Sequence, residues 1–313
     1  MKKERILITG GAGYIGSILT PLLLDQGYQV TVYDNLIYNQ ISVLNWLIYP
    51  NFRFVKSDVI DFEVLKQEIM KHDIIIPLAA IVGAPACSSK IELTKLINYE
   101  SIKFIVKNSS SDQKILYPNS NSGYGIGKKD KYCDETSPLN PISLYARTKV
   151  QAEEVVLSSK NGIAFRLATV FGVSPRMRLD LLVNDFTFRA CHDKFIILFE
   201  GHFNRNFVHV RDVAQAFIFG IENFDKMKGE IYNVGLNDAN INKLQLCEQI
   251  KKHVPDLYIH LAEIGEDPDK RDYIVSSDKL EKLGWKPKYS LNDGIKELIA
   301  GYPFFKRTKF NNI

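Results

Sequence analysis

The pattern Gly-x-x-Gly-x-x-Gly at residues 10–16 constrains the fold of this chain more than any other feature. It follows the apolar, β-branched run Arg5–Thr9, which is typical of a parallel strand covered on both faces. Apolar residues then recur at helical spacing up to Leu23, and Gly27 ends the predicted helix. A strand, a glycine turn and a helix in this order predict a βαβ unit whose helix start faces a phosphate.

The alternation of strands and helices continues to about residue 172. We expect strands at Gln29–Tyr33, Phe52–Val55, Ile74–Leu78, Lys114–Tyr117 and Ile163–Leu167, and helices at Phe62–Lys71, Ile91–Asn108 and Ser143–Ser159. Strands that alternate with helices indicate the α/β class. The sequence therefore predicts a Rossmann-type, doubly wound parallel sheet over residues 1–172.

After Gly172 the pattern becomes less regular. We expect a helix at Leu181–Cys191, a short strand pair within Ile196–Val210, and helices at Val213–Asn223, Lys243–His253 and Leu291–Ala300. These elements predict a smaller mixed α/β lobe over residues 173–313 that binds the substrate. Segments near residues 205–235 are expected to return to the first domain.

Composition excludes several classes of protein. The chain has 313 residues, of which 45% are hydrophobic and 24% charged, as in ordinary globular proteins. A net charge of +4 is too small to indicate a nucleic-acid surface, and no apolar run has the length of a membrane span. The four cysteines lack metal-ligand spacing. We expect a cytoplasmic protein with free thiols, no metal, and no nucleic-acid or membrane partner.

The three glycines have distinct expected roles at a dinucleotide site. Gly10 allows the tight turn, Gly13 lets the backbone approach a pyrophosphate, and Gly16 permits close packing of helix on strand. The N–H groups at the helix start, around Tyr14 and Ile15, would face the phosphates. The alternative is a glycine-rich turn that binds no ligand.

An acidic residue follows the second predicted strand. The carboxylate of Asp34 is placed to accept hydrogen bonds from a ribose diol and to repel a 2′-phosphate. No arginine stands at Asn35 or Leu36 to hold such a phosphate, so NAD is favoured over NADP. The alternative is that Asp34 only caps the end of the strand and binds no ribose. Asp58-Val59 is placed near the adenine edge, or else forms a turn.

Tyr145 and Lys149 are spaced so that they share one face of a predicted helix. A free tyrosine has a pKa of about 10, and a nearby cation would favour its phenolate, which makes it a general base for an alcohol. Ser120, in the polar segment 119–125, would hydrogen-bond the reacting oxygen. The alternatives are a solvated helix face for the pair and local turns for the serine.

These motifs together resemble those of the extended short-chain dehydrogenase/reductases that act on nucleotide sugars, a family that includes epimerases and 4,6-dehydratases. The resemblance covers nearly the whole chain. It rests on residues 9–16, Asp58-Val59, Leu78-Ala79-Ala80, Ser120, Tyr145-x-x-x-Lys149, Arg205–Ala214, Tyr232–Gly235 and Leu283–Pro287.

The resemblance implies residue roles. Tyr145 would be the general base, Lys149 would bind the nicotinamide ribose, and Ser120 would aid the sugar oxygen. The implied cofactor side comprises Gly10, Gly13, Tyr14, Ile15, Gly16, Asp34, Asn35, Asp58, Val59, Leu78, Ala79, Ala80 and Asn98, together with Tyr145 and Lys149. The implied substrate side comprises Ser122, Thr169, Arg178, Asn184, Arg205 and Arg271. The two last arginines would face the diphosphate, with a surface ion pair as the alternative for Arg205.

Two sequence details narrow the implied reaction. The 4,6-dehydratases place an acid within two residues of the catalytic hydroxyl, whereas this chain has Asn121-Ser122, which disfavours dehydration. Segments 117–127, 174–185 and 199–203 resemble the branch that oxidises GDP-heptose at its 4-position in bacterial capsule synthesis. We therefore expect an NAD-dependent enzyme that oxidises a nucleotide sugar to a 4-keto sugar. A 4-epimerase and a non-catalytic NAD-binding regulator are the alternatives.

The resemblance also implies a homodimer. Its four-helix contact would pair the predicted helices Ile91–Asn108 and Ser143–Ser159 with those of a second copy. The apolar positions that would supply the contact, or instead face the sheet, are Ile102, Ile105, Val150, Val155 and Val156.

Overall fold

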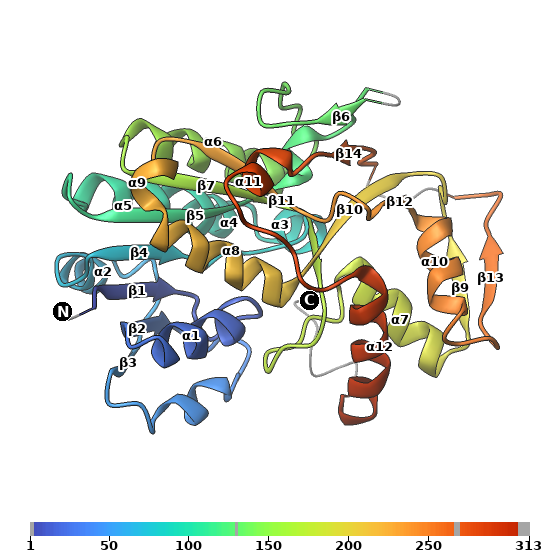
Figure 1. The fold of residues 1–313 in the computed structure, drawn as a ribbon, viewed down its shortest axis with the longest axis horizontal. Helices are drawn as coiled ribbons and strands as arrows, with labels where there is room; N and C mark the ends of the chain where they lie inside the picture. The colour runs from blue at the N-terminus through green and yellow to red at the C-terminus, as the bar shows by residue number, and fades with distance from the viewer. Residues whose placement is uncertain (1–2, 129–130, 266–269, 306–313) are drawn as a thin grey trace.

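A parallel sheet forms the centre of the computed structural model, which describes residues 3–128, 131–265 and 270–305 (Figure 1). Its seven strands have the order β11-β7-β5-β4-β1-β2-β3, and every ladder between them is parallel. The strands are β1 (Arg5–Thr9), β2 (Gln29–Asp34), β3 (Phe52–Lys56), β4 (Ile74–Pro77), β5 (Lys114–Ser120), β7 (Gly162–Leu167) and β11 (Ile231–Val234). The strand order reverses at β1, so the predicted doubly wound α/β sheet is confirmed.

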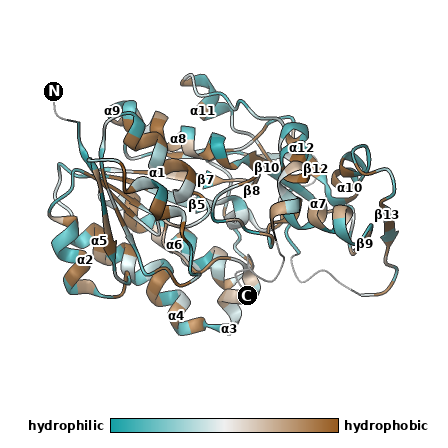
Figure 2. Cartoon of the chain, turned by 90° about the horizontal axis from the view of Figure 1, so that it is seen from below, coloured by the Kyte–Doolittle hydropathy of each residue, from teal (hydrophilic) through white to brown (hydrophobic). Residues whose placement is uncertain are grey.

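Helices cover both faces of this sheet. On one face lie α1 (Gly16–Asp25) and α8 (Val210–Glu222), and on the other lie α2 (Phe62–Ile69), α5 (Ser101–Asn108) and α6 (Leu144–Ser158). Successive strand residues point to opposite faces, so Ile6 and Ile8 pack in one core and Leu7 in the other. In Figure 2 the strands are mostly brown, as expected where both faces are buried.

The predicted helix over residues 91–108 is continuous but contains a π-turn. It consists of α4 (Ile91–Lys95), the π-turn Leu96–Glu100 and α5, and is preceded by α3 (Ala84–Ser89). Within the π-turn, the buried amide of Asn98 donates to the backbone oxygen of Ile81 and accepts from its backbone nitrogen, both at 2.8 Å. The wider turn thus places Asn98 where it fixes the chain that follows β4.

The apolar positions expected at a dimer contact mostly face this subunit's own sheet. Ile102, Ile105 and Val156 belong to the core beneath α5 and α6, and Val150 is also buried. Val155 alone among the five is partly exposed. The second of the two expected arrangements, in which the side chains face the sheet, is therefore observed for Ile102, Ile105 and Val156.

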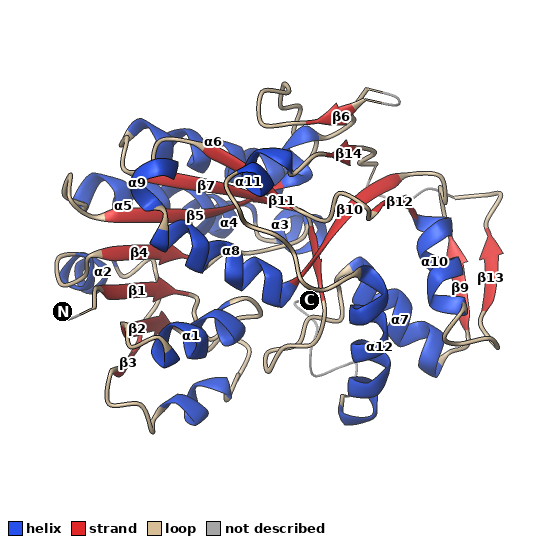
Figure 3. Ribbon diagram, in the orientation of Figure 1, coloured by secondary structure: helices blue, strands red, loops and turns tan. Residues whose placement is uncertain are grey.

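The second lobe is built from small sheets and helices (Figure 3). Strands β8 (Thr169–Phe171), β10 (Asn204–His209) and β12 (Asn240–Asn242) form one sheet, β9 (Phe195–Leu198) pairs with β13 (Tyr258–Leu261), and β6 (Tyr132–Cys133) pairs with β14 (Ile274–Val275). The longer helices are α7 (Leu182–His192), α10 (Lys243–Lys251) and α12 (Leu291–Gly301). The 3-10 turn Tyr302–Phe304 follows α12. The short helices α9 (Phe224–Met227) and α11 (Asp278–Lys282) and the 3-10 turn Ser42–Trp46 pack instead with the core of the seven-stranded sheet, and the 3-10 turn Asn121–Tyr124 directly follows β5.

The expected pairing of two strands within residues 196–210 is wrong. Both strands form, but β9 pairs with β13 while β10 pairs with β8 and β12. Their partners come from distant parts of the chain, and β9 runs parallel to β13, which requires the crossover through α10. Local spacing carries no information about such partners.

Membrane-spanning helices and metal-binding clusters are both absent from the described residues. None of the helices there is both long and apolar enough to cross a bilayer. No cluster of three or more His, Cys, Asp or Glu side chains there is arranged to hold a metal ion. The four cysteines, Cys87, Cys133, Cys191 and Cys247, are free.

A buried ion pair links α6 to the sheet. Arg166 on β7 and Glu153 on α6 are 3% and 2% exposed, and their side chains form two hydrogen bonds of 2.7 and 3.0 Å. Asn119 donates to the same carboxylate at 2.6 Å, and Arg166 also donates to the hydroxyl of Tyr124 at 3.1 Å. Each charge is therefore compensated only while the other is present.

We expect Arg166→Met to lower the free energy of unfolding by about 3–5 kcal/mol, because it leaves the Glu153 carboxylate buried without its cation. The double variant R166M/E153L removes both charges and should recover most of that loss. Urea denaturation of the two variants and the parent tests this. A single variant as stable as the parent would show that the pair is not electrostatically coupled.

Candidate active site

The glycine turn after β1 depends on two close backbone contacts. Gly10 has a φ of +68°, and a Cβ there would lie 2.5 Å from the backbone nitrogen of Ala79. A Cβ at Gly16 would lie 2.3 Å from the backbone oxygen of Gly11. At Gly13 a Cβ would meet only the backbone oxygen of Gly10, at 3.0 Å, so the rest of its surroundings is open. The turn is tight on the protein side and open where a ligand would lie.

Backbone donors at the start of α1 face this open side. Among the described residues, the N–H groups of Tyr14 and Ile15 donate to no other protein group. Unpaired N–H groups and the positive end of the helix dipole favour an anion. The turn therefore fits the pyrophosphate of a dinucleotide.

Asp34 ends β2 beside the turn and is 7% exposed. Its carboxylate accepts hydrogen bonds from the backbone of Ala12 (3.0 Å) and Leu36 (2.8 Å) and from the Gln40 amide (3.3 Å). Burial raises the pKa of Asp34, and the two backbone donors oppose that rise. A carboxylate held between the glycine turn and the next loop fits a ribose diol.

The other predicted cofactor residues lie around the same edge of the sheet. Leu78 donates from its backbone nitrogen to Thr9 (2.9 Å), so residues 78–80 lie beside the glycine turn. The Asn35 amide donates to the carboxylate of Asp58 at 2.7 Å, while Val59 is buried in the core. The Asn98 side chain, in contrast, is not free to contact a cofactor, because its amide is hydrogen-bonded to the backbone of Ile81. Asn98 therefore acts on the site only by fixing the backbone after β4.

The predicted catalytic residues come together at the ends of two adjacent elements. Ser120 is the last residue of β5, and Tyr145 and Lys149 lie one turn apart at the start of α6, which Ser143 caps by accepting from Ala146 at 3.1 Å. Ser120 lies close enough to the Tyr145 hydroxyl to favour its phenolate, although burial outweighs this effect on the pKa. The Lys149 ammonium group lies 4.1 Å from the ring centroid of Tyr117 beneath them.

The electrostatics of this pair differ from the expectation. Burial raises the pKa of Tyr145, and the charge of Arg178 is the strongest influence that lowers it. Burial also lowers the pKa of Lys149 to about 7, against the pull of the Glu153 carboxylate. At neutral pH Lys149 is therefore only partly charged in the ligand-free protein, and burial outweighs the lowering of the Tyr145 pKa that the spacing predicts.

A thiol that sequence reasoning missed lies next to the pair. Cys87 on α3 is fully buried, donates to the backbone oxygen of Ile81 at 3.3 Å, and interacts electrostatically with both Tyr145 and Lys149. Burial raises the pKa of Cys87, so it is a neutral group at pH 7. A cysteine without a spaced partner carries no signal in the sequence that would place it here.

The segment after β8 is fastened to the glycine turn. The Tyr14 hydroxyl donates to the backbone oxygen of Gly172 at 2.6 Å, and the Ser174 hydroxyl donates to that of Tyr14 at 2.7 Å. The amide of Asn184, predicted to bind substrate, instead accepts from the backbone of Gly172 (3.1 Å) and donates to that of Arg178 (2.9 Å). Asn184 thus holds the segment that carries Arg178.

Of the three predicted substrate arginines, two act on the phenol of Tyr145 and the third is held by backbone contacts. Arg178 is ion-paired with Asp180 (2.6 Å), and its charge and that of Arg271 both lower the pKa of Tyr145. Arg205 is 2% exposed and donates to the backbone oxygens of Asn204 and Arg271. Arg205 therefore holds the backbone at Arg271.

Polar side chains without partners lie directly after Ser120. Within the described part of the chain, the Ser122 hydroxyl and both polar atoms of the Asn121 amide are buried and make no hydrogen bond. Buried polar groups are normally paired, so these atoms mark a place for a polar ligand or water. Thr169, the remaining predicted substrate residue, begins β8 opposite Phe207.

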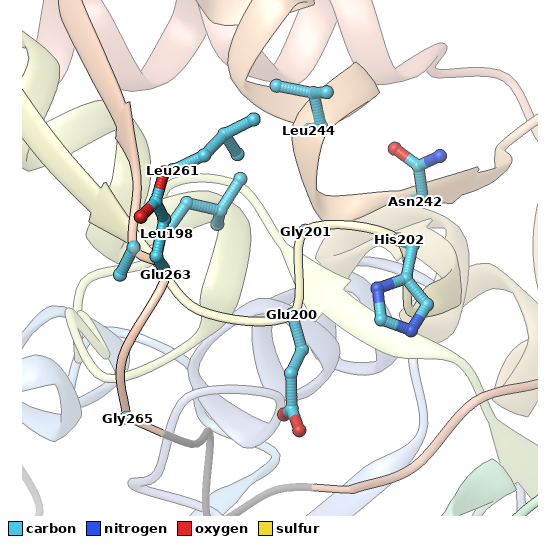
Figure 4. Close-up of a pocket in the computed structure, with 10 residues that line it drawn as sticks. Leu198, Glu200, Gly201, His202, Asn242, Leu244, Leu261, Glu263 and Gly265 are labelled. Atoms are coloured by element: carbon cyan, nitrogen blue, oxygen red, sulfur yellow. The ribbon is translucent and has the colours of Figure 1, made fainter.

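A cavity of about 470 Å³ lies in the second lobe near β9 and β13 (Figure 4). Its apolar wall includes Leu198, Leu244 and Leu261, and its polar groups are Glu200, His202, Asn242 and Glu263. Figures 1 and 2 both show this part of the lobe well separated from α6. Its volume is in the range of small-molecule sites.

Comparisons with known proteins agree with this geometry. The model of the NAD dependent epimerase/dehydratase family matches residues 6–235. The chain is 28% identical over 334 residues to the dTDP-D-glucose 4,6-dehydratase of Bos taurus, covering 99% of this chain and 90% of that protein.

Two solved structures have the same fold. A UDP-glucose 4-epimerase from Thermotoga maritima, with UDP-glucose, superposes with a TM-score of 0.83 at 25% identity, covering 96% of this chain and 98% of that one. A dTDP-glucose 4,6-dehydratase from Bacillus anthracis, in complex with NAD, has a TM-score of 0.82 at 24% identity and covers 96% and 97%.

We expect Lys149→Met to stabilise the ligand-free protein at neutral pH. A lysine with a pKa of 10.5 when unfolded and about 7 when folded costs stability at every pH below 10.5. The cost grows by about 1.4 kcal/mol per pH unit as pH falls from 10.5 to 7, and is constant below. The difference in unfolding free energy between K149M and the parent should therefore shrink as pH rises. Chemical denaturation at pH 7, 8 and 9 measures it, and a pH-independent difference contradicts the assignment.

Proposed function

Because the chain belongs to the NAD dependent epimerase/dehydratase family, we propose that it oxidises a nucleotide-activated sugar at the 4-hydroxyl to a 4-keto sugar. NAD is the cofactor, and the open glycine turn, the unpaired amides of Tyr14 and Ile15 and the carboxylate of Asp34 are the groups that would hold it. The observation that carries the proposal is that Ser120 at the end of β5 meets Tyr145 and Lys149 at the start of α6, at the same edge of the sheet.

The proposed proton path uses residues of this chain. NAD, when bound, accepts the hydride from the sugar carbon. Tyr145 takes the hydroxyl proton, while Ser120 holds the oxygen in line. Since burial disfavours the phenolate, the charges of Arg178 and Arg271 are needed to lower the pKa of Tyr145, and a protonated Lys149 would lower it further.

The residues after Ser120 favour oxidation over dehydration. Elimination of water needs an acid and a base beside the catalytic hydroxyl, and Asn121 and Ser122 supply neither near neutral pH. Their unpartnered polar atoms suit the binding of neutral sugar hydroxyls instead.

For the substrate we propose a GDP-linked heptose of bacterial capsule synthesis. The resemblance of segments 117–127, 174–185 and 199–203 to the branch that oxidises GDP-heptose supports heptose as the sugar. The cavity near β9 supports guanine as the base, because the carboxylates of Glu200 and Glu263, which line it, can accept hydrogen bonds from the N–H donors of guanine. Arg205 and Arg271 would lie along the diphosphate between the base and Tyr145.

The proposal includes a homodimer formed across the outer faces of α5 and α6. These two helices pack side by side, and Val155 on α6 is half-buried. Of the five positions expected from the sequence, Val155 is therefore the one that remains for this contact.

A 4-epimerase is the second candidate, supported by the likeness to the Thermotoga maritima enzyme. Epimerisation uses the same Tyr145, Lys149 and Ser120, and differs in that the 4-keto sugar stays bound and is reduced again on its other face.

We expect Tyr145→Phe to lower turnover by about 100- to 10,000-fold, because it removes the proton acceptor but leaves the nucleotide contacts in place. NAD affinity, measured by calorimetry, should stay within about threefold of the parent. A variant that retains turnover would exclude Tyr145 as the base. A parent without turnover on any nucleotide sugar would favour the non-catalytic regulator.

We expect GDP-heptose to reduce the cofactor. The absorbance of the reduced nicotinamide should rise in proportion to the 4-keto sugar formed, and thermal shifts should be larger with GDP than with UDP, CDP or dTDP. A change of sugar configuration without net reduction indicates the epimerase. A larger shift with another nucleotide contradicts the assignment of the base.

A further inference from the structure

The loop after β2 connects the Asp34 carboxylate to an aromatic ring. The backbone nitrogen of Tyr38 donates to the Gln40 amide oxygen at 3.0 Å, and the Gln40 amide nitrogen donates to Asp34 at 3.3 Å. Gln40 therefore fixes the position of Tyr38 relative to the carboxylate that suits the adenosine ribose.

An arginine from the second lobe lies on this ring. The guanidinium carbon of Arg176 is 4.4 Å from the centroid of the Tyr38 ring, and the residue is 5% exposed. Its charge acts on Asp34, and that of Asp34 acts on Arg176. A cation is thus present on the side of Asp34 that faces the second lobe.

The position of Arg176 is set by its neighbours. Gly172 and Ser174, just before it, are bonded to Tyr14 of the glycine turn at 2.6 and 2.7 Å. Arg176 itself also donates to the backbone oxygen of Met177. The segment is therefore attached to the cofactor domain at the pyrophosphate end and at the ribose end.

We propose that Arg176 forms the outer wall of the adenosine-ribose end of the NAD site, and that Asp34 alone prevents it from binding the 2′-phosphate of NADP. A guanidinium group pairs well with phosphate oxygens, whereas a buried carboxylate beside it repels them. The inference rests on the NAD site and not on the sugar, so it holds or fails independently of the proposed reaction.

The test uses the full-length protein and isothermal titration calorimetry with NAD and NADP, after the nucleotide it already carries has been quantified. Asp34→Ser should raise the affinity for NADP relative to NAD by about tenfold or more. Adding Arg176→Ala to that variant should lower NADP affinity about tenfold and change NAD affinity by less than about threefold.

Arg178→Ala is the matched control, since Arg178 lies on the same segment but is paired with Asp180. In the D34S background it can weaken both nucleotides, but it should leave their ratio unchanged. The proposal fails if R176A weakens NAD and NADP equally, or if D34S does not gain NADP affinity. If D34S is unstable, Asp34→Asn replaces it. Loss of both nucleotides by D34N would show that Asp34 is required for binding itself, which also overturns the proposal.

Discussion

The structure depends first on the absence of side chains at two points of the turn after β1. Gly10 lies against the backbone of Ala79, and Gly16 lies against the backbone of Gly11, so that any Cβ would overlap backbone atoms there. The first contact joins the end of β1 to the end of β4, and the second sets α1 directly on the turn. Both contacts fix the turn at the point of the sheet where the strand order reverses.

Desolvation is the main influence on the pKa values of the two catalytic candidates, Tyr145 and Lys149. Tyr145 and Lys149 share a helix face, yet burial favours the neutral form of each, with a pKa of about 7 for Lys149. Two charges act against this effect: Arg178, on the segment after β8, lowers the pKa of Tyr145, and Glu153, one turn beyond Lys149 on the same helix, raises that of Lys149. Glu153 is in turn held by Arg166 on β7. The reactivity of the pair is thus a property of the assembled lobes.

The two lobes meet through Tyr14, a residue of the glycine turn itself. Its hydroxyl and its backbone oxygen bond to Gly172 and Ser174, which brings Arg176 and Arg178 to opposite ends of the cofactor side. Positive charge is therefore supplied to the cofactor domain by the lobe that would hold the substrate. A shift of the segment after β8 would change both ends together.

Local periods and spacings in the sequence were enough to predict the sheet, the glycine turn, the acidic residue after β2 and the shared face of Tyr145 and Lys149. It did not reveal the partners of β9 and β10, the π-turn around Asn98, the thiol of Cys87 or the stacking of Arg176 on Tyr38. Those features join residues far apart in the chain, and only the tertiary structure decides such contacts. Whether a side chain is buried also depends on tertiary contacts. Burial raises the pKa of Tyr145, whereas its spacing from Lys149 alone indicated a lowered pKa.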